Sequence, residues 1–204
     1  MKLLDIFLLP RRLYQNLTDR KLPLYLGILF VGLADLALPH LKENYIKLFA
    51  NKSLNALLCN VILAVLFAVV IGLVDVIFFS VPLFDLFKVF RKEKEVSEAC
   101  NLRIKLMKIY ILAHVIIVPV NIILYFVFPN INVNSNNPLI VLLAYISLLV
   151  MVWFSAIISR GINSIYSFQP VFRRVVFLTV FLWNFILAPV LEYIISSWIM
   201  PLFR

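Results

Sequence analysis

The sequence predicts an all-α fold: a polytopic membrane protein built as a five-transmembrane-helix bundle, with short cytoplasmic helices at the membrane interface. Composition is the first observation, because 64% of the 204 residues are hydrophobic and 14% are charged, whereas a soluble domain is about half apolar and a quarter charged. The second observation is a series of apolar runs near or above the ~18 residues that cross a bilayer. These runs occupy nearly the whole chain, so we expect one membrane domain, residues 1–204, and no second domain.

Apolar runs of suitable length follow one another along the chain. Proline has no backbone N–H with which to continue a helix, and we expect Pro82, Pro129 and Pro201 to end the second, third and fifth runs. An uncharged, asparagine-rich loop, residues 130–138, separates the third run from the fourth. The predicted spans are residues 23–41, 56–81, 106–128, 139–159 and 175–199.

The basic residues fix the orientation of these spans. Of the 19 Lys and Arg residues, 15 fall before the first span, between the second and third, or between the fourth and fifth. The others, Lys42, Lys47, Lys52 and Arg204, fall on the opposite side. Cytoplasmic loops carry the excess of Lys and Arg, so we expect a cytoplasmic N-terminus and an outer C-terminus. Five spans satisfy this alternation, whereas four or six do not.

The formal net charge of +9 does not call for a nucleic-acid partner. Basic residues beside membrane helices interact with anionic lipid headgroups at about 1 kcal/mol each. The expected partners are therefore the lipid bilayer and anionic headgroups at the cytoplasmic face. Cys59 and Cys100 cannot build a disulfide scaffold, and their spacing fits no metal site.

Two segments are predicted to lie at the cytoplasmic surface. In residues 1–10, and again in Leu83–Lys92, apolar residues recur opposite charged ones. Such stripes suit a helix that lies in the interface. The second segment could instead extend the second span into the cytosol and return through residues 96–106, and the sequence leaves both interpretations open.

Small and polar residues gather on one face of each span. In the second span Ala68 and Gly72 belong to a series with a four-residue step, and Asp75 follows three residues later. Residues at these spacings share a helix face, and small residues let a second helix approach closely within lipid. We therefore expect Asp75 to point into the bundle. We also expect Pro119 and Pro189 to kink the third and fifth spans.

The inward faces give a candidate intramembrane polar cluster. The rise of ~1.5 Å per residue predicts two layers, an inner one with Asp75, His114 and Asn184 and an outer one with the remaining members. The full candidate set is Asp35, Asn60, Asp75, His114, Asn121, Asn184 and Glu192.

Intramembrane carboxylates suggest function, because each costs ~2.5–3.5 kcal/mol on insertion scales. One interpretation is a proton or cation path through Asp35, Asp75, His114 and Glu192, and a His–carboxylate cluster could also hold a transition metal. The other interpretation is structural, with the acids hydrogen-bonded inside the bundle. The chain has no HExxH, CxxC, GxSxG or phosphate-binding loop, so we expect neither an enzyme nor a resident metal or cofactor.

The N-terminal pattern and the layout resemble a known family. Residues 5–14 (DIFLLPRRLY) precede residues 22–29 (LPLYLGIL), and the first span ends in residues 35–39 (DLALP). With five spans, this is similar to the Yip1-domain family of membrane proteins, particularly its short prokaryotic members. The resemblance implies a non-enzymatic, multi-pass protein of a cell membrane, a prokaryotic plasma membrane rather than an endomembrane.

Two functions follow from these observations. The family resemblance and the small-residue face of the second span predict a scaffold or accessory factor for membrane trafficking or transport systems, which binds other membrane proteins or itself. The alternative is a small transporter or ion- or proton-binding protein that uses Asp35, Asp75 and His114. Convergence of these side chains on a cavity favours the alternative, and dry, fully paired side chains favour the scaffold.

Overall fold

The computed structural model describes residues 8–37, 53–90, 96–127, 138–199 and 201. The regular structure in these residues is helical, apart from caps and short connections. The elements are α2 (Arg11–Gln15), α3 (Leu22–Ala37), α5 (Leu54–Val89), α6 (Val96–Val127), α7 (Pro138–Tyr166), α8 (Pro170–Ile194) and the π-helical turn η2 (Ile195–Ile199).

Four of the described helices, α5, α6, α7 and α8 with η2, are long and apolar enough to cross a membrane. Large apolar side chains lie exposed along them, as in α5, where the spacing places one stripe on the outer surface: Leu58, Ile62, Leu66, Val69 and Leu73. Lipid rather than water must cover such a surface, because monomeric soluble proteins rarely expose large contiguous apolar patches. These four helices therefore indicate a membrane protein.

The first predicted span is described only in part. Helix α3 is apolar, but its 16 residues reach ~24 Å, which is less than the ~30 Å of a hydrocarbon core. The predicted span 23–41 continues into residues 38–52, which lie outside the described residues. The count of five spans therefore stays a prediction.

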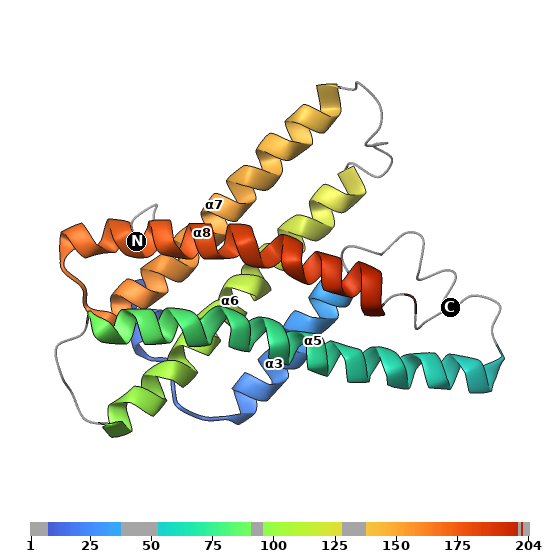
Figure 1. Ribbon diagram of the computed structural model, residues 1–204, viewed down its shortest axis with the longest axis horizontal. Helices are drawn as coiled ribbons and strands as arrows, with labels where there is room; N and C mark the ends of the chain where they lie inside the picture. Colours follow the sequence, from blue (N-terminus) through green and yellow to red (C-terminus); the bar gives the residue numbers. More distant parts are fainter. Residues whose placement is uncertain (1–7, 38–52, 91–95, 128–137, 200, 202–204) are drawn as a thin grey trace.

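The long helices form two sets that cross obliquely (Figure 1). Helices α5 and α8 lie along the long axis of the molecule and run in opposite directions, while α3, α6 and α7 cross them obliquely. Helix α3 packs on α5 and α6, α7 packs on α6 and α8, and α5 also contacts α8. Helix α3 and the four longer helices therefore all face one common interior.

The helix that carries the second predicted span does not end at Pro82, because α5 continues through Pro82 to Val89. Proline lacks the N–H that would bond to the carbonyl four residues earlier, which here belongs to Phe78. The indole Nε1 of Trp183 in α8 donates to that oxygen at 3.2 Å. A neighbouring helix thus satisfies the carbonyl that the proline releases, as the bilayer requires.

The structure also decides between the two interpretations of Leu83–Lys92. Leu83, Phe84 and Phe87 are buried inside the protein, and the ring of Phe87 packs against Tyr166 at 6.1 Å between ring centroids. The segment up to Val89 is therefore an extension of α5 that packs on the α7–α8 connection, and the interfacial alternative is wrong for it. In the other segment, residues 1–7 lie outside the described part of the chain.

The closest helix pair is held together at two glycines. A Cβ atom at Gly32 of α3 would overlap the backbone carbonyl of Ala68, and one at Gly72 of α5 would overlap the carbonyl oxygen of Ile28. The two backbones therefore touch directly, which only residues without a side chain allow. Gly27 differs, because its Cβ would meet side-chain atoms of Ile111 and no backbone atom, with the nearest atom at 2.5 Å.

Two buried polar side chains fasten the segment before α3 to the bundle. The Tyr14 hydroxyl lies 3.1 Å from the Leu8 carbonyl oxygen and 3.2 Å from that of Ile157 in α7. Burial raises the pKa of Tyr14, so the hydroxyl stays protonated and donates. On α6, the ammonium of Lys108 donates to the carbonyl oxygens of Thr18 and Arg20, the latter at 2.6 Å.

The contact between α3 and α5 at Gly32 leads to a prediction about the stability of the protein. We expect Gly32→Ala to lower the unfolding free energy in detergent by about 1–3 kcal/mol, because an overpacked backbone contact must move apart. Gly27→Ala is the matched control on the same helix and should cost less, since a side chain rather than a backbone segment has to shift. Thermal melting followed by size-exclusion chromatography measures both, and equal losses would contradict the contact.

The Trp183 hydrogen bond makes a second prediction. We expect Trp183→Phe to cost about 1 kcal/mol of unfolding free energy, within the range for hydrogen bonds between membrane helices. In a Pro82→Ala background the new N–H of residue 82 can bond to the Phe78 carbonyl, so the same Trp183 change should cost much less. Denaturant titration of the four proteins in micelles measures this coupling, and an identical cost in both backgrounds would rule the bond out.

Candidate functional site

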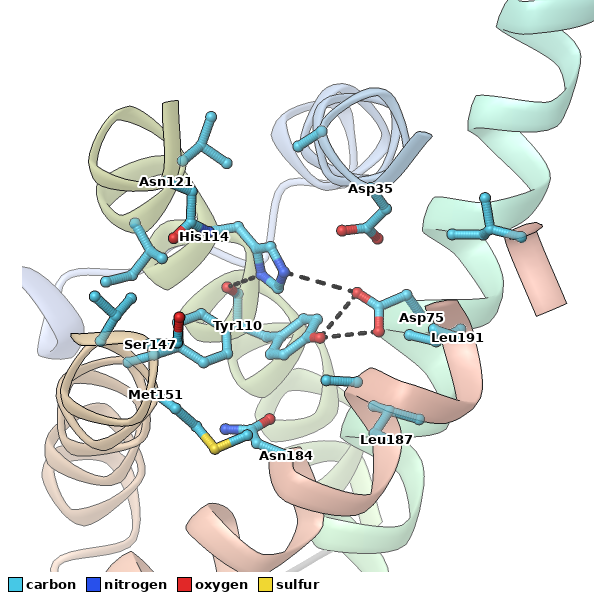
Figure 2. Close-up of a pocket in the computed structure, with 17 residues that line it drawn as sticks. Asp35, Asp75, Tyr110, His114, Asn121, Ser147, Met151, Asn184, Leu187 and Leu191 are labelled. Atoms are coloured by element: carbon cyan, nitrogen blue, oxygen red, sulfur yellow. Dashed lines mark hydrogen bonds and ion pairs between the residues drawn. The ribbon is translucent and has the colours of Figure 1, made fainter. Parts of the chain in front are cut away.

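A cavity of about 300 Å³ lies inside the bundle. Its walls come from α3, α5, α6, α7 and α8 together with η2, so that each long helix contributes to it (Figure 2). The polar and sulfur-containing side chains that line it are Asp35, Asp75, Tyr110, His114, Asn121, Ser147, Met151 and Asn184.

Asp75 of α5 is held in one position by Tyr110 of α6. The carboxylate is 1% exposed, and the Tyr110 hydroxyl lies 2.9 Å from Oδ1 and 2.8 Å from Oδ2, so that one O–H is shared between both oxygens. The ring of Tyr110 stacks on Phe79, with centroids 3.9 Å apart. Phe79 lies four residues after Asp75 on α5, so the ring and the hydroxyl together orient the carboxylate.

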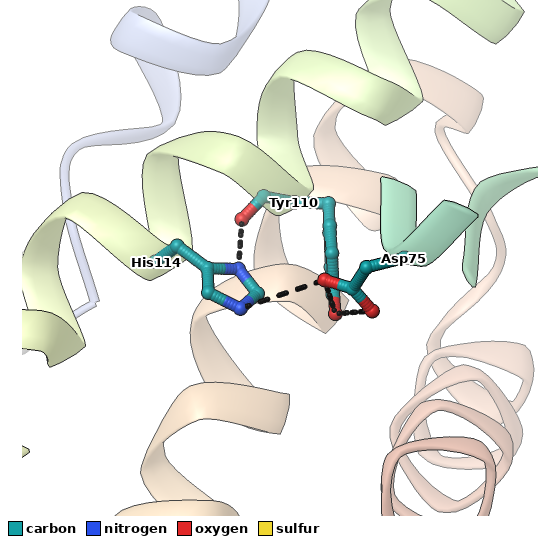
Figure 3. Close-up of polar contacts among 3 residues, drawn as sticks. All are labelled: Asp75, Tyr110 and His114. Carbon is teal, nitrogen blue, oxygen red and sulfur yellow. Dashed lines mark hydrogen bonds and ion pairs between the residues drawn. The ribbon is translucent and has the colours of Figure 1, made fainter. Parts of the chain in front are cut away.

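His114 lies one helical turn after Tyr110 and faces the same carboxylate (Figure 3). Its Nδ1 lies 3.2 Å from the backbone oxygen of Tyr110, and its Nε2 lies 3.9 Å from Oδ2 of Asp75. A carbonyl oxygen only accepts hydrogen bonds, so this contact requires the proton on Nδ1. In the neutral ring the lone pair of Nε2 then points toward Asp75.

Asp35 of α3 completes the group. One ligand atom from each of Asp35, Asp75 and His114 lies within 4.8 Å of the other two, a spacing at which these side chains could hold a metal ion. Figure 2 shows the Asp35 carboxylate directed toward Asp75. Its Oδ2 is buried and has no hydrogen-bond partner among the described residues.

These three groups can bind positive charge. Two carboxylates that share a site cannot both ionise without a proton or a cation between them, and the effect is strong where water is scarce. Tyr110 supplies one hydrogen bond to Asp75, but Oδ2 of Asp35 has no hydrogen-bond partner among the described residues. The arrangement is therefore suited to a bound cation or a shared proton.

The cavity brings together five of the seven predicted residues: Asp35, Asp75, His114, Asn121 and Asn184. The Asn184 amide also donates to Ser155 of α7 at 3.1 Å. Asn60 does not line the cavity, since fifteen residues of helix place it ~22 Å from Asp75 along α5. Glu192 does not line it either, because it is exposed beside the cavity residue Leu191.

The prediction of two separate polar layers is wrong for Asp35, which lies with Asp75 and His114. Asp35 follows Gly32 by three residues, and Asp75 follows Gly72 by three. Because α3 and α5 touch at these glycines and cross obliquely (Figure 1), both carboxylates leave the crossing point toward the same cavity. The depth estimate treated the helices as parallel and so separated them.

Tyr110 was expected on the polar face of the third span but was left out of the candidate cluster, although it makes the shortest polar contact in the site, 2.8 Å to Oδ2 of Asp75. The sequence feature that identifies Tyr110 is its position four residues before His114, because this spacing places both residues on one face of α6. Phe154, which packs edge-on against His114 at 4.9 Å, carried no such signal.

Comparison with family models, with curated proteins and with solved structures finds no match to this chain. The resemblance to the Yip1-domain family therefore stays a prediction. Inferences about function rest on the geometry of the cavity.

The Tyr110 contact can be tested against a second tyrosine on the same helix. We expect Tyr110→Phe to lower the unfolding free energy by about 1–3 kcal/mol, the cost of leaving a buried acceptor unpaired. Tyr125→Phe removes a buried hydroxyl with no hydrogen-bond partner among the described residues and should change stability little. Denaturant titration in micelles compares them, and a Tyr125 loss as large as the Tyr110 loss would argue against a specific bond.

Proposed function

We propose that this protein is a small membrane transport protein that binds a cation between its helices and carries it across the bilayer. The single observation behind this proposal is the convergence of Asp35, Asp75 and His114 on one cavity, with ligand atoms within 4.8 Å. Ionisable groups inside membrane segments mark ion and proton pathways. The protein acts without catalysis in this proposal.

The polar side chains of the cavity are incompletely paired, which favours binding over a structural role. A structural pair of acids would be stabilised by donors on both carboxylates. Here Asp75 receives the Tyr110 hydroxyl, whereas Asp35 Oδ2 has no partner among the described residues. The cavity of about 300 Å³ beside them leaves room for an ion with its water.

One of the two observations that favoured the scaffold function, the small-residue face of the second span, no longer favours it. The scaffold function was expected partly from this face, as a surface for another membrane protein. In the described bundle the Ala68–Gly72 part of that face is covered by α3. The remaining support is the resemblance to the Yip1-domain family, so the transport proposal is the better supported of the two.

The proposal includes a topology. We propose that α3 begins a fifth span, with the N-terminus in the cytoplasm, the C-terminus outside and the protein in a prokaryotic plasma membrane. The support for this orientation is the position of 15 of the 19 Lys and Arg residues on one side. In this topology an ion moving through the bundle would pass between a basic cytoplasmic face and a weakly charged outer face.

Flux through reconstituted vesicles tests the function. Protein in liposomes should carry H⁺, read by trapped pyranine, or Co²⁺, read by quenching of trapped calcein, faster than protein-free liposomes. We expect Asp75→Asn to abolish this flux, because it removes the central negative charge. Asp85→Asn is the matched control, an exposed aspartate on the same helix, and should keep the wild-type rate.

Two results would count against transport. One is wild-type protein that carries neither H⁺ nor Co²⁺ above the protein-free rate. The other is a flux that Asp75→Asn and Asp85→Asn leave equally unchanged, which would place the pathway elsewhere in the bundle.

A further inference from the structure

We propose that Asp35, Asp75 and His114 form a binding site for one divalent transition-metal ion, of the class that includes Zn²⁺, Mn²⁺ and Co²⁺. This inference rests on the proposed function and names the cation. The three residues come from α3, α5 and α6, and one ligand atom of each lies within 4.8 Å of the other two.

The donor set indicates the class of ion. Imidazole nitrogen suits first-row transition metals, while carboxylate oxygen also suits harder divalent ions such as Mn²⁺. An alkali ion takes oxygen ligands, so it would leave His114 without a role, although the ring faces Asp75 at 3.9 Å. One nitrogen with two carboxylates therefore favours a transition metal over Na⁺ or K⁺.

The charge of the set indicates a divalent ion. Two ionised carboxylates and a neutral imidazole carry a charge of −2, which one divalent cation cancels. A net charge of zero is the state that a membrane interior favours, because an uncompensated charge there is expensive. Two protons would also neutralise the pair of aspartates, but a monovalent cation or a single proton would leave it negative.

The hydrogen bond at Nδ1 of His114 leaves Nε2 as the nitrogen that can bind a metal ion. Metal-binding histidines almost always donate their second N–H to a carbonyl or a carboxylate, which fixes the ring and its tautomer. The Nδ1 of His114 makes this contact with the Tyr110 carbonyl oxygen at 3.2 Å. The lone pair of Nε2 then faces Oδ2 of Asp75 at 3.9 Å, where a metal ion would bind to both atoms.

The carboxylates of Asp35 and Asp75 are also placed to bind a metal ion. Tyr110 donates to both oxygens of Asp75, an orienting contact of the kind that supports metal ligands. Oδ2 of Asp35 is buried without a partner among the described residues, and Figure 2 shows this carboxylate directed toward Asp75. Tetrahedral ligands lie about 3.4 Å apart around Zn²⁺, so modest side-chain rotation closes the group, and water in the cavity can supply the fourth ligand.

Direct metal binding tests the inference. Full-length protein in detergent, freed of any affinity tag and treated with a chelator, is titrated with Co²⁺ and followed by visible absorption and equilibrium dialysis. We expect one Co²⁺ per chain, displaced by Zn²⁺. His114→Ala and Asp75→Asn should weaken binding by at least 100-fold, and Tyr110→Phe by roughly 10–100-fold.

The controls separate this site from adventitious binding. Asp85→Asn, on the same helix but outside the cavity, should bind Co²⁺ like the wild type. Wild-type protein that binds no Co²⁺, or variants that all bind it equally, would overturn the inference. If His114→Ala does not fold, X-ray absorption of Zn²⁺-loaded wild type decides instead, because one imidazole with oxygen ligands is expected and a spectrum without imidazole overturns the site.

The metal titration and the flux assay can fail separately. Proton flux that depends on Asp75, in a protein that binds no Co²⁺ or Zn²⁺, would leave the transport function standing and overturn the metal site. Stoichiometric Co²⁺ binding that depends on His114, in vesicles that pass neither Co²⁺ nor H⁺, would support the metal site and overturn transport.

Discussion

The direct backbone contact between α3 and α5 is the constraint on which the arrangement of the interior depends. Within lipid there is no hydrophobic drive for helices to associate, so close packing has to supply it. Gly32 and Gly72 let the two backbones touch, and this contact sets how α3 crosses α5. Asp35 and Asp75 each follow one of these glycines by three residues. The same crossing that joins the helices therefore brings two acids together.

A neighbouring helix satisfies one of the backbone hydrogen bonds that the prolines break. Pro82, Pro119 and Pro189 all lie inside continuous helices, and each removes one N–H from the backbone ladder. For Pro82 the released carbonyl of Phe78 takes the indole N–H of Trp183. In water a solvent molecule could do this, but in the bilayer another helix must, so the proline also links α5 to α8.

The membrane class and the approximate spans could be predicted from the sequence, because hydropathy reports directly on contact with lipid. Hydropathy does not report where a helix stops. The end of α5 carries charges on one side and packs Leu83, Phe84 and Phe87 on the other, so a hydropathy limit near Pro82 missed it. The inward direction of Asp75 followed from helical spacing. Its meeting with Asp35 did not, since a crossing angle is a property of two surfaces and not of either sequence alone.

Asp35 and Asp75 differ in the hydrogen bonds that they receive, and this difference favours a binding function over a purely structural one. A carboxylate within the bilayer costs ~2.5–3.5 kcal/mol even on insertion scales, and a purely structural one is stabilised when donors surround it. Asp75 has the Tyr110 hydroxyl, but Oδ2 of Asp35 has no hydrogen-bond partner among the described residues. A cation bound among Asp35, Asp75 and His114 would give Oδ2 of Asp35 a partner and offset the negative charge of the acids, which is the physical reason for proposing that this cavity binds positive charge.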